Sequence, residues 1–353
     1  MKRFGYLLEK ISDKNNIRKA ILVSSLGKRD KAIVKQVLSN IDFYIDDIYE
    51  ILISESFENH YLEPIMIYEK MSKKWRPLHR PLYYPDQIIQ WCCILVLEPI
   101  FRLGMDYHCV ASVKGRGNKH IQDHLIPVIK YDRKNTRWVW KYDIYHFYES
   151  IDQDILIHKL EHKIKDKKCI NLLAKFIRFL PKGLCLGSPI NVWLANFYLQ
   201  KHDHYLREKL HVKHMFRYAD DVVVLGSNKR KLIKDDESIR RFLKDEELKL
   251  HDDINIWKFD DHPIDFVGFV YFRNFKVIIR KRIWRNIRRC LLRIKVHRDK
   301  LTSKLKRRFA SYWGYIKNSN SYLILNKYCN EIRDLFSFVD KYLTRLNVKA
   351  VNL

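Results

Sequence analysis

Two adjacent carboxylates, Asp220 and Asp221, lie between short apolar runs at residues 216–219 and 222–225. The β-branched and aromatic residues on both sides predict a β-hairpin with the acidic pair at its turn. Two like charges at a turn between buried strands destabilise the fold unless a cation shares them. The pattern therefore indicates a divalent metal site of the kind that transfers nucleotidyl groups. A solvated Asp-Asp turn explains the same residues, and a third carboxylate and a nucleic-acid surface would favour the metal site.

A further carboxylate, Asp143, lies at the end of a run rich in β-branched and aromatic residues over 138–144 that predicts a strand. The aromatic pair Phe147-Tyr148 comes next, ahead of a helix. Two metal ions about 4 Å apart need carboxylates from separate strands that converge on one point. Asp143 and Asp220 satisfy this requirement if tertiary folding brings their two strands together.

The elements around these carboxylates indicate an α+β fold. Residues 1–70 place apolar side chains at helical period, and two basic, proline-containing stretches follow at 73–81 and 83–86. Helices are predicted at 88–101, 154–179, 191–210 and 236–248, and strands at 254–258 and 264–279. Helices and strands are interspersed without the regular alternation of a parallel sheet, which favours the α+β class.

The charge of the chain points to a polyanionic partner. Its 353 residues carry a formal net charge of +27, and 47% of them are hydrophobic. Such a protein attracts nucleic acid first and an anionic membrane surface only as a distant second. No apolar run is long enough to span a bilayer and the N-terminus lacks a signal-peptide core, so no membrane and a cytoplasmic location are expected.

No histidine pairs with a cysteine at metal-ligand spacing. The seven cysteines contain no CxxC pair, which is typical of reduced, mostly buried thiols in a cytosolic protein. The fifteen histidines are scattered. His202-Asp203-His204 could form a metal clip, but adjacent residues of a helix point apart, so a helix surface is expected there.

Residues 280–308 form a strongly basic segment. Fourteen of them are Lys or Arg, and Asp299 is their only acidic residue. Trp284, Ile287, Leu291 and Ile294 recur at helical spacing and give one apolar stripe. A solvated basic helix has this pattern, and so does a helix that lies along the phosphate backbone of a duplex.

The order and spacing of these motifs resemble those of reverse transcriptases. Asp143 with its aromatic pair, residues 183–199 and the tetrapeptide at 218–221 resemble the family's A, B and C motifs. Residues 76–90, 97–101 and 114–117 resemble the fingers motifs of bacterial reverse transcriptases, and 265–269 resemble the hairpin that grips the primer end. The likeness extends over about residues 70–345. It is strongest to the reverse transcriptases of diversity-generating retroelements and their near bacterial relatives.

The resemblance implies a right-hand polymerase. Residues 1–70 would be a helical N-terminal region. Residues 71–280 would form the fingers and a palm built on an antiparallel sheet with helices on one face, and 281–353 a basic helical thumb.

The resemblance also implies roles for the carboxylates. Asp143 and Asp220 would hold two Mg²⁺ ions, for which Mn²⁺ can substitute, that activate the primer 3′-hydroxyl and neutralise the triphosphate. Asp221 would be the third, mainly supporting acid, and the carbonyl of Ile144 would complete one metal shell. Tyr148 matches the aromatic residue that excludes a 2′-hydroxyl, although a core tyrosine would show the same pattern.

Other positions are carried over with less specific roles. The cations that suit the incoming triphosphate are Arg76, Arg80, Lys114 and Arg116. Residues that would contact primer or template are Tyr218, Gly268, Arg288 and Arg289. Lys258 is a candidate for the lysine that protonates the leaving pyrophosphate.

One departure from the family bears on fidelity. Leu186 stands where most reverse transcriptases carry a glutamine whose amide contacts the nascent base pair, and an aliphatic residue cannot make those hydrogen bonds. Diversity-generating enzymes also carry an aliphatic residue there and copy template adenines with low fidelity. Asn191-Val192 replaces the Ser-Gln pair of that subgroup, which weakens the assignment to it.

The expected function is therefore RNA-directed DNA synthesis, error-prone and in a diversity-generating retroelement. Its partners would be an RNA template, a DNA or RNA primer, dNTPs and a small accessory protein. An antiviral-defence enzyme with the same palm chemistry and a catalytically inactive nucleic-acid-binding relative are the alternatives. The presence of all three carboxylates counts against the inactive relative.

Overall fold

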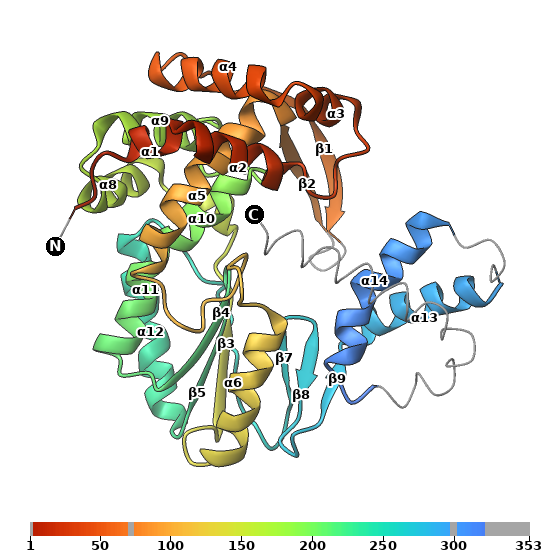
Figure 1. Ribbon diagram of the computed structural model, residues 1–353. Helices are drawn as coiled ribbons and strands as arrows, with labels where there is room; N and C mark the ends of the chain where they lie inside the picture. Colours follow the sequence, from red (N-terminus) through yellow and green to blue (C-terminus); the bar gives the residue numbers. More distant parts are fainter. Residues whose placement is uncertain (1–2, 70–73, 297–301, 322–353) are drawn as a thin grey trace.

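The computed structural model describes residues 3–69, 74–296 and 302–321, which form helices around two main sheets and a separate strand pair (Figure 1). The chain begins with four helices, α1 (Leu7–Ser12), α2 (Lys14–Ser24), α3 (Ala32–Ser39) and α4 (Ile41–Ile53). They bury Ile17, Ile21 and Ile48 in a core shared with the long helix α5 (Ile88–Arg102). The predicted helix at 88–101 is thus present.

The helical region does not extend to residue 70 as predicted. β1 (Tyr61–Glu69) pairs antiparallel with β2 (Lys74–Pro81), ahead of a π-helical turn over Tyr83–Gln87. Ile65, Ile67 and Tyr68 are β-branched or aromatic residues that suit an extended strand better than a helix.

The central sheet has the antiparallel order β4-β5-β3-β6, built from β3 (Trp138–Tyr142), β4 (His214–Tyr218), β5 (Asp221–Gly226) and β6 (Ile256–Lys258). Successive side chains alternate between two cores, since Trp140 and Val224 face one and Val139 and Val223 the other. Both faces are therefore buried, and this explains the unbroken apolar run of β5.

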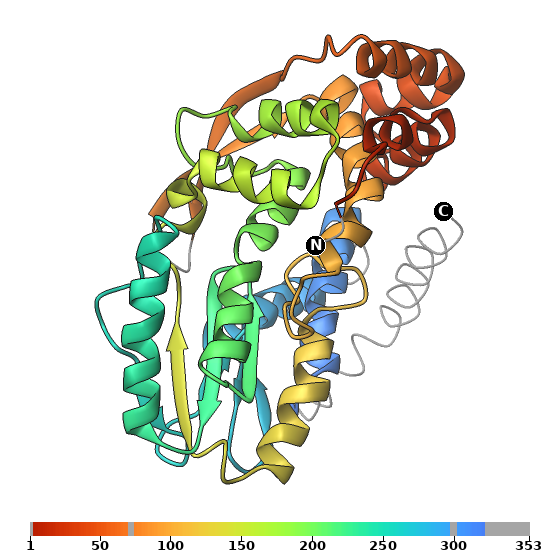
Figure 2. The ribbon, with the colours of Figure 1, turned by 90° about the vertical axis from the view of Figure 1, so that its left-hand side faces the viewer.

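Helices cover the two faces of this sheet (Figure 2). One face packs against α10 (Pro189–Tyr198) and α12 (Lys229–Asp245), and α11 (Gln200–His204) follows α10 on that side. The other face packs against α6 (Asn118–Tyr131) through Ile121 and Leu125. The α+β class and the antiparallel sheet expected from the sequence are confirmed. The expectation of helices on one face only is wrong, because β3 and β5 bury side chains on both faces and α6 covers the second.

Two predicted helices are interrupted. Residues 154–179 form α8 (Gln153–Lys163) and α9 (Lys167–Ile177), because the backbone becomes extended at Ile164 and Asp166 then caps α9 by accepting from the Cys169 N–H. Residues 191–210 form α10, α11 and a π-helical turn over Tyr205–Lys209. The helix predicted at 236–248 begins earlier, at Lys229, where Asn228 accepts backbone hydrogen bonds as its N-cap.

A second antiparallel sheet, β7 (Ile264–Phe266), β8 (Phe269–Tyr271) and β9 (Val277–Ile279), leads into α13 (Lys281–Val296) and α14 (Ser303–Lys317). Ile287, Leu291 and Ile294 are buried as the predicted stripe, while Trp284 is only half-buried. The basic side chains of α13 stay at the surface, as an amphipathic helix requires.

The described cysteines are buried, as the sequence predicts. Six cysteines fall in the described part of the chain, and all of them are buried free thiols, while Cys329 lies outside it. Within the described ranges, no helix combines the length and apolar character that a bilayer crossing demands.

Candidate active site

The three carboxylates meet at one end of the central sheet. Tyr142 pairs with Val222 across β3 and β5, and Tyr218 pairs with Asp221 across the β4–β5 hairpin. This register places Asp143, which follows β3, beside the hairpin turn. Asp143, Asp220 and Asp221 line one cleft of about 690 Å³ together with Arg76.

The hairpin turn is short and constrained. Ala219 and Asp220 alone connect β4 to β5, and Ala219 has a φ of +54°, in the left-handed region that non-glycine residues seldom adopt. Arg217 Nη1 donates a hydrogen bond of 2.9 Å to the Ala219 carbonyl. Strained backbone of this kind persists where surrounding structure holds it, often at functional sites.

Asp221 is less exposed than Asp143, at 29% against 54% of the side chain. Burial raises the pKa of its carboxyl to about 6, and the negative charges of Asp220 and Asp143 act in the same direction. Lys141 opposes them, with Nζ 3.3 Å from Asp221 Oδ1. That oxygen is buried and receives no hydrogen bond of good geometry from the residues that the structure describes.

These oxygens fit a divalent cation. Mg²⁺ and Mn²⁺ prefer carboxylate and carbonyl oxygens, and here three carboxylates and a buried, unsatisfied oxygen share one cleft. Ile144, the carbonyl candidate, is buried next to Asp143 and forms an antiparallel bridge with Leu250. The donor set is the one expected for Mg²⁺.

Asp221→Asn is expected to stabilise the metal-free protein at neutral pH. Because the pKa of Asp221 is raised from 3.8 to about 6 on folding, its charged form destabilises the fold, and that cost grows as pH rises through this range. The asparagine variant should gain up to about 3 kcal/mol in unfolding free energy at pH 7. Chemical denaturation in EDTA at pH 7 and at pH 4 measures the difference. An equal difference at both pH values would contradict the assignment.

Residues 249–255 contribute to the cleft in a way that sequence reasoning missed. The Lys141 N–H donates to the Asn255 carbonyl and the Tyr145 N–H to the Lys249 carbonyl, so this segment runs beside β3. It brings His251 Nε2 to 3.5 Å from Asp143 Oδ2. No local pattern in residues 249–255 indicates this pairing, because it is created by backbone hydrogen bonds to β3 and to Tyr145 that lie ahead of the start of β6.

Tyr148 lies close to the carboxylates. Burial raises the pKa of its hydroxyl, and the nearby Asp220 and Tyr218 raise it further. The Leu184 N–H donates 2.7 Å to the Tyr148 carbonyl. Gly183 has a φ of +71°, and a Cβ at this position would lie 2.5 Å from the same carbonyl, so close packing there requires glycine.

The loop 183–188 also contacts β2. The His79 N–H donates 2.9 Å to the Leu186 carbonyl. Gly187, at a φ of +104°, would place a Cβ 2.1 Å from the His79 carbonyl. The loop thus connects β2, which carries Arg76, to the backbone of Tyr148, with Leu186 half-buried between them.

The four predicted triphosphate cations are not gathered in one place. Of the four, Arg76 lines the carboxylate cleft, with Nη1 3.9 Å from Glu149 Oε1. Arg80 is exposed on β2, and Lys114 is exposed in the loop between α5 and α6. Arg116 Nη1 donates to the carbonyls of Asp106 and Cys109, so the structure gives Arg116 a role in holding its own loop.

Tyr218 and Gly268 lie next to α14. Burial and then Tyr315 of α14 raise the pKa of Tyr218, whose side chain remains partly exposed. A Cβ at Gly268 would lie 2.7 Å from Tyr315 Cε1, and Gly268 has a φ of +83°. The hairpin turn, the β7–β8 turn and α14 therefore adjoin. Arg288 and Arg289 are exposed on α13, and Lys258 forms an exposed ion pair with Asp261 at 3.9 Å.

A buried polar network supports the ends of both carboxylate strands. Asp203 accepts three hydrogen bonds of 2.7–3.0 Å from the Arg217 guanidinium. Asp203 also contacts His202, whose Nε2 lies 2.8 Å from the Tyr142 hydroxyl. The network thus links Tyr142, which precedes Asp143, to Arg217, which donates to the Ala219 carbonyl.

The position of the network corrects a prediction. His202 and Asp203 were expected on a helix surface, but their side chains are each 1% exposed. Burial opposes both charges, yet the attraction of Arg217 lowers the pKa of Asp203 and Asp203 raises that of Arg217. An arginine inside the apolar strand β4 was the available signal, since a charge buried there requires a partner.

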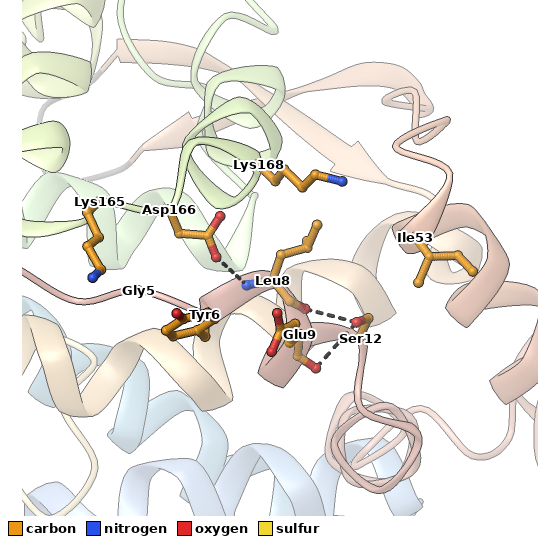
Figure 3. Close-up of a pocket in the computed structure, with 9 residues that line it drawn as sticks. All are labelled: Gly5, Tyr6, Leu8, Glu9, Ser12, Ile53, Lys165, Asp166 and Lys168. Atoms are coloured by element: carbon orange, nitrogen blue, oxygen red, sulfur yellow. Dashed lines mark hydrogen bonds between the residues drawn. The ribbon is translucent and has the colours of Figure 1, made fainter.

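Another hollow, of about 490 Å³, lies far from the carboxylates at α1 (Figure 3). Asp166 accepts hydrogen bonds from the Leu7 and Leu8 N–H groups there, at 2.7 and 2.9 Å, in addition to capping α9. Its carboxylate thus joins the starts of α1 and α9.

Comparison with known proteins identifies the family of this chain. The family model for reverse transcriptase (RNA-dependent DNA polymerase) matches residues 67–271, more than half of the chain. The chain is 27% identical over 178 residues to protein YkfC of Escherichia coli K12, covering 45% of each protein. It is 27% identical over 198 residues to the group II intron-encoded protein LtrA of Lactococcus lactis subsp. cremoris, covering 52% of this chain and 32% of LtrA. The match thus spans less than half the length of these relatives.

Solved structures give a weaker likeness. Apo telomerase from Candida tropicalis has a TM-score of 0.47 at 13% identity, covering 94% of this chain and 77% of that one. Telomerase from Candida albicans with a fragment of telomeric RNA has a TM-score of 0.49 at 11% identity, covering 81% and 56%. The extent of the family match, which includes all three carboxylates, establishes that this chain belongs to the reverse transcriptase family.

Proposed function

We propose that this protein is an RNA-directed DNA polymerase that extends a primer by two-metal nucleotidyl transfer. The observation that carries the proposal is the convergence of Asp143, Asp220 and Asp221 in one cleft lined by Arg76. Carboxylates from separate strand ends are the arrangement that a two-metal site needs. Mg²⁺, or Mn²⁺ in its place, would supply activation of the primer 3′-hydroxyl and charge neutralisation at the triphosphate.

Each residue of the cleft has a task in this proposal. Asp143 and Asp220 hold the cations, and the carbonyl of Ile144 completes one shell. Asp221, paired with Lys141, supports the site through its charge. Arg76 orients the triphosphate, since a guanidinium matches phosphate oxygens in a bidentate manner. Tyr148, fixed through its backbone by the loop 183–188, limits the space under the sugar and disfavours a 2′-hydroxyl.

The surrounding elements suit an RNA template and a DNA or RNA primer. The net charge of +27 favours polyanions. Arg288 and Arg289 present exposed charge on α13, where a duplex backbone would lie, and Tyr218 with Gly268 adjoins α14 at the primer end. In this assignment residues 71–280 are fingers and palm, 281–353 are the thumb, and the N-terminal helices are a separate region.

Primer extension tests the proposal. Purified protein with Mg²⁺, dNTPs and a primed RNA should extend the primer, and a parallel reaction should include the RNA and proteins encoded beside its gene. The parallel reaction tests whether synthesis requires an accessory protein. Absence of extension in both reactions, from protein that binds the primed RNA, would refute the polymerase assignment.

We further propose that synthesis is error-prone, as in diversity-generating retroelements. Leu186 lies in the loop between β2 and Tyr148 and offers no side-chain hydrogen bond to a nascent base pair. Leu186→Gln should lower misincorporation opposite template adenine, because an amide can donate and accept there. Sequencing of the cDNA measures the error spectrum, and Leu103→Gln, at an exposed leucine outside the cleft, is the control. An unchanged spectrum in Leu186→Gln would remove this residue from the argument.

A further inference from the structure

Three histidines outside the proposed chemistry converge between the α5–α6 loop and α6. His108 belongs to the loop, and His120 and His124 lie on the first two turns of α6. Each offers one ring nitrogen such that these atoms lie within 4.8 Å of one another. We propose that His108, His120 and His124 form a binding site for a divalent transition-metal ion, Zn²⁺ foremost, separate from the carboxylate cleft.

The backbone places these rings on one side. His120 and His124 are four residues apart on a helix, so their side chains share a face. Their ring centroids are 4.3 Å apart, and the His108 ring lies 5.1 Å from His124 and 5.7 Å from His120. Three imidazoles from two elements therefore surround one point, and small ring rotations bring their nitrogens to a common ligand.

Hydrogen bonding leaves ring nitrogens available. His124 Nδ1 lies 2.7 Å from the His120 carbonyl, which fixes the proton on Nδ1 and leaves the lone pair of Nε2. Metal-binding histidines commonly donate their other N–H to a backbone carbonyl in this way. His108 Nδ1 and His120 Nε2 are buried and lack hydrogen-bond partners among the described residues.

The local electrostatics permit a cation. Burial lowers the pKa of His108 to about 4, and burial followed by His124 lowers the pKa of His120, so these imidazoles are neutral at pH 7. Neutral imidazole is the form that binds metal. Asp106 balances the charge of Arg207 at 2.8 Å, whereas Arg116, which donates to loop carbonyls, is the one positive charge that acts on His120, and Asp123 opposes it.

The donor type selects the metal. Three imidazole nitrogens with a fourth position for water match a common Zn²⁺ arrangement. Mg²⁺ prefers oxygen ligands and would remain at the carboxylates. Tyr107 packs edge-on against all three rings and is itself covered by the Arg116 guanidinium, so the cluster is partly enclosed.

A bound ion would fasten the α5–α6 loop to the central sheet. The Arg217 N–H donates to the His108 carbonyl, and the Val110 N–H donates to the Arg217 carbonyl, so His108 lies beside β4. α6 packs on the same sheet through Ile121 and Leu125. The ion would therefore link the α5–α6 loop to α6 beside β4, the strand that leads to the carboxylate hairpin.

Zinc titration of the full chain tests the site. Protein freed of transition metals, and kept in excess Mg²⁺ to occupy the carboxylates, is titrated with Zn²⁺ against a chromogenic chelator. One site is expected, and His124→Gln should weaken it at least about tenfold. His158→Ala with His162→Ala is the matched control, because these residues form an exposed pair on α8 with Nε2 atoms 3.0 Å apart but without a third imidazole. The control should bind Zn²⁺ like the wild type.

Two further measurements separate binding from folding. Circular dichroism of the metal-free variants verifies the fold, and Zn²⁺ should raise the Tm of the wild type and the control but not of His124→Gln. The Co²⁺-loaded wild type should show the intense visible absorption of a four-coordinate ion held by three nitrogens and a water, whatever the variants do. Wild-type protein without a Zn²⁺ site, an affinity unchanged in His124→Gln, or a weak octahedral Co²⁺ spectrum would each overturn the proposal.

Discussion

Asp220→Asn is expected to reduce primer extension at least about 10³-fold. Asparagine keeps the volume of the side chain but removes the charge at the turn between β4 and β5, where Asp220 faces the cleft shared with Asp143. Charge stabilisation by a bound metal ion contributes several kcal/mol to a transition state. Since each 1.36 kcal/mol corresponds to a factor of ten in rate, loss of a principal ligand has an effect of this size.

The other carboxylates should respond unequally. Asp143→Asn should be as damaging as Asp220→Asn, because each supplies one strand end of the site. Asp221→Asn should retain more activity, since Asp221 is largely buried and pairs with Lys141. The three rates, measured with saturating dNTPs and with Mg²⁺ varied, therefore test the division between metal ligand and supporting acid.

A matched control isolates the effect of position. Asp154→Asn removes one charge from an exposed carboxylate of α8, outside the cleft, and should leave the rate unchanged. Binding of primed RNA should persist in all variants, because it depends on the basic surface. Asp220→Asn protein that folds, binds primed RNA and extends at a rate within tenfold of the wild type would disprove the two-metal assignment.

Local patterns predicted the parts of the site that depend on neighbours in sequence. The hairpin at 214–226 and the strand ending before Asp143 were recognisable because β-branched and aromatic residues flank a short acidic turn. The basic, amphipathic α13 was equally visible, because its stripe of Ile287, Leu291 and Ile294 follows the helical period. In each case one element contains the whole signal.

Long-range contacts could not be predicted in this way. His251 reaches Asp143 only because residues 249–255 extend along β3. The three histidines of the proposed zinc site come from a loop and a helix and become a cluster only when the α5–α6 loop folds onto α6. Asp203 carries a charge in a helix and was assigned to a surface, because its partner Arg217 lies in a separate strand.

The Asp203–Arg217 pair is expected to be essential for both stability and catalysis. Asp203→Asn leaves the buried guanidinium of Arg217 without its counter-charge, and breaking one side of a buried ion pair costs about 3–5 kcal/mol of unfolding free energy. Chemical denaturation measures this loss. Asp154→Asn is the control, because Asp154 pairs with Arg178 at 2.8 Å on the surface and such pairs contribute about 0–1 kcal/mol.

The catalytic effect of the same pair arises from geometry. Asp203 orients Arg217, and Arg217 holds the Ala219 carbonyl at the left-handed position before Asp220. A displacement of about 1 Å at a reacting centre can cost about 10²-fold in rate. Arg217→Lys keeps the charge but lacks the planar fork that reaches both Asp203 and Ala219. It should therefore lower kcat about 10²-fold and raise the Mg²⁺ requirement, with a smaller loss of stability than Asp203→Asn. If Arg217→Lys, measured below its Tm, has the kcat and the Mg²⁺ requirement of the wild type, then the pair stabilises the fold without positioning the metal ligands.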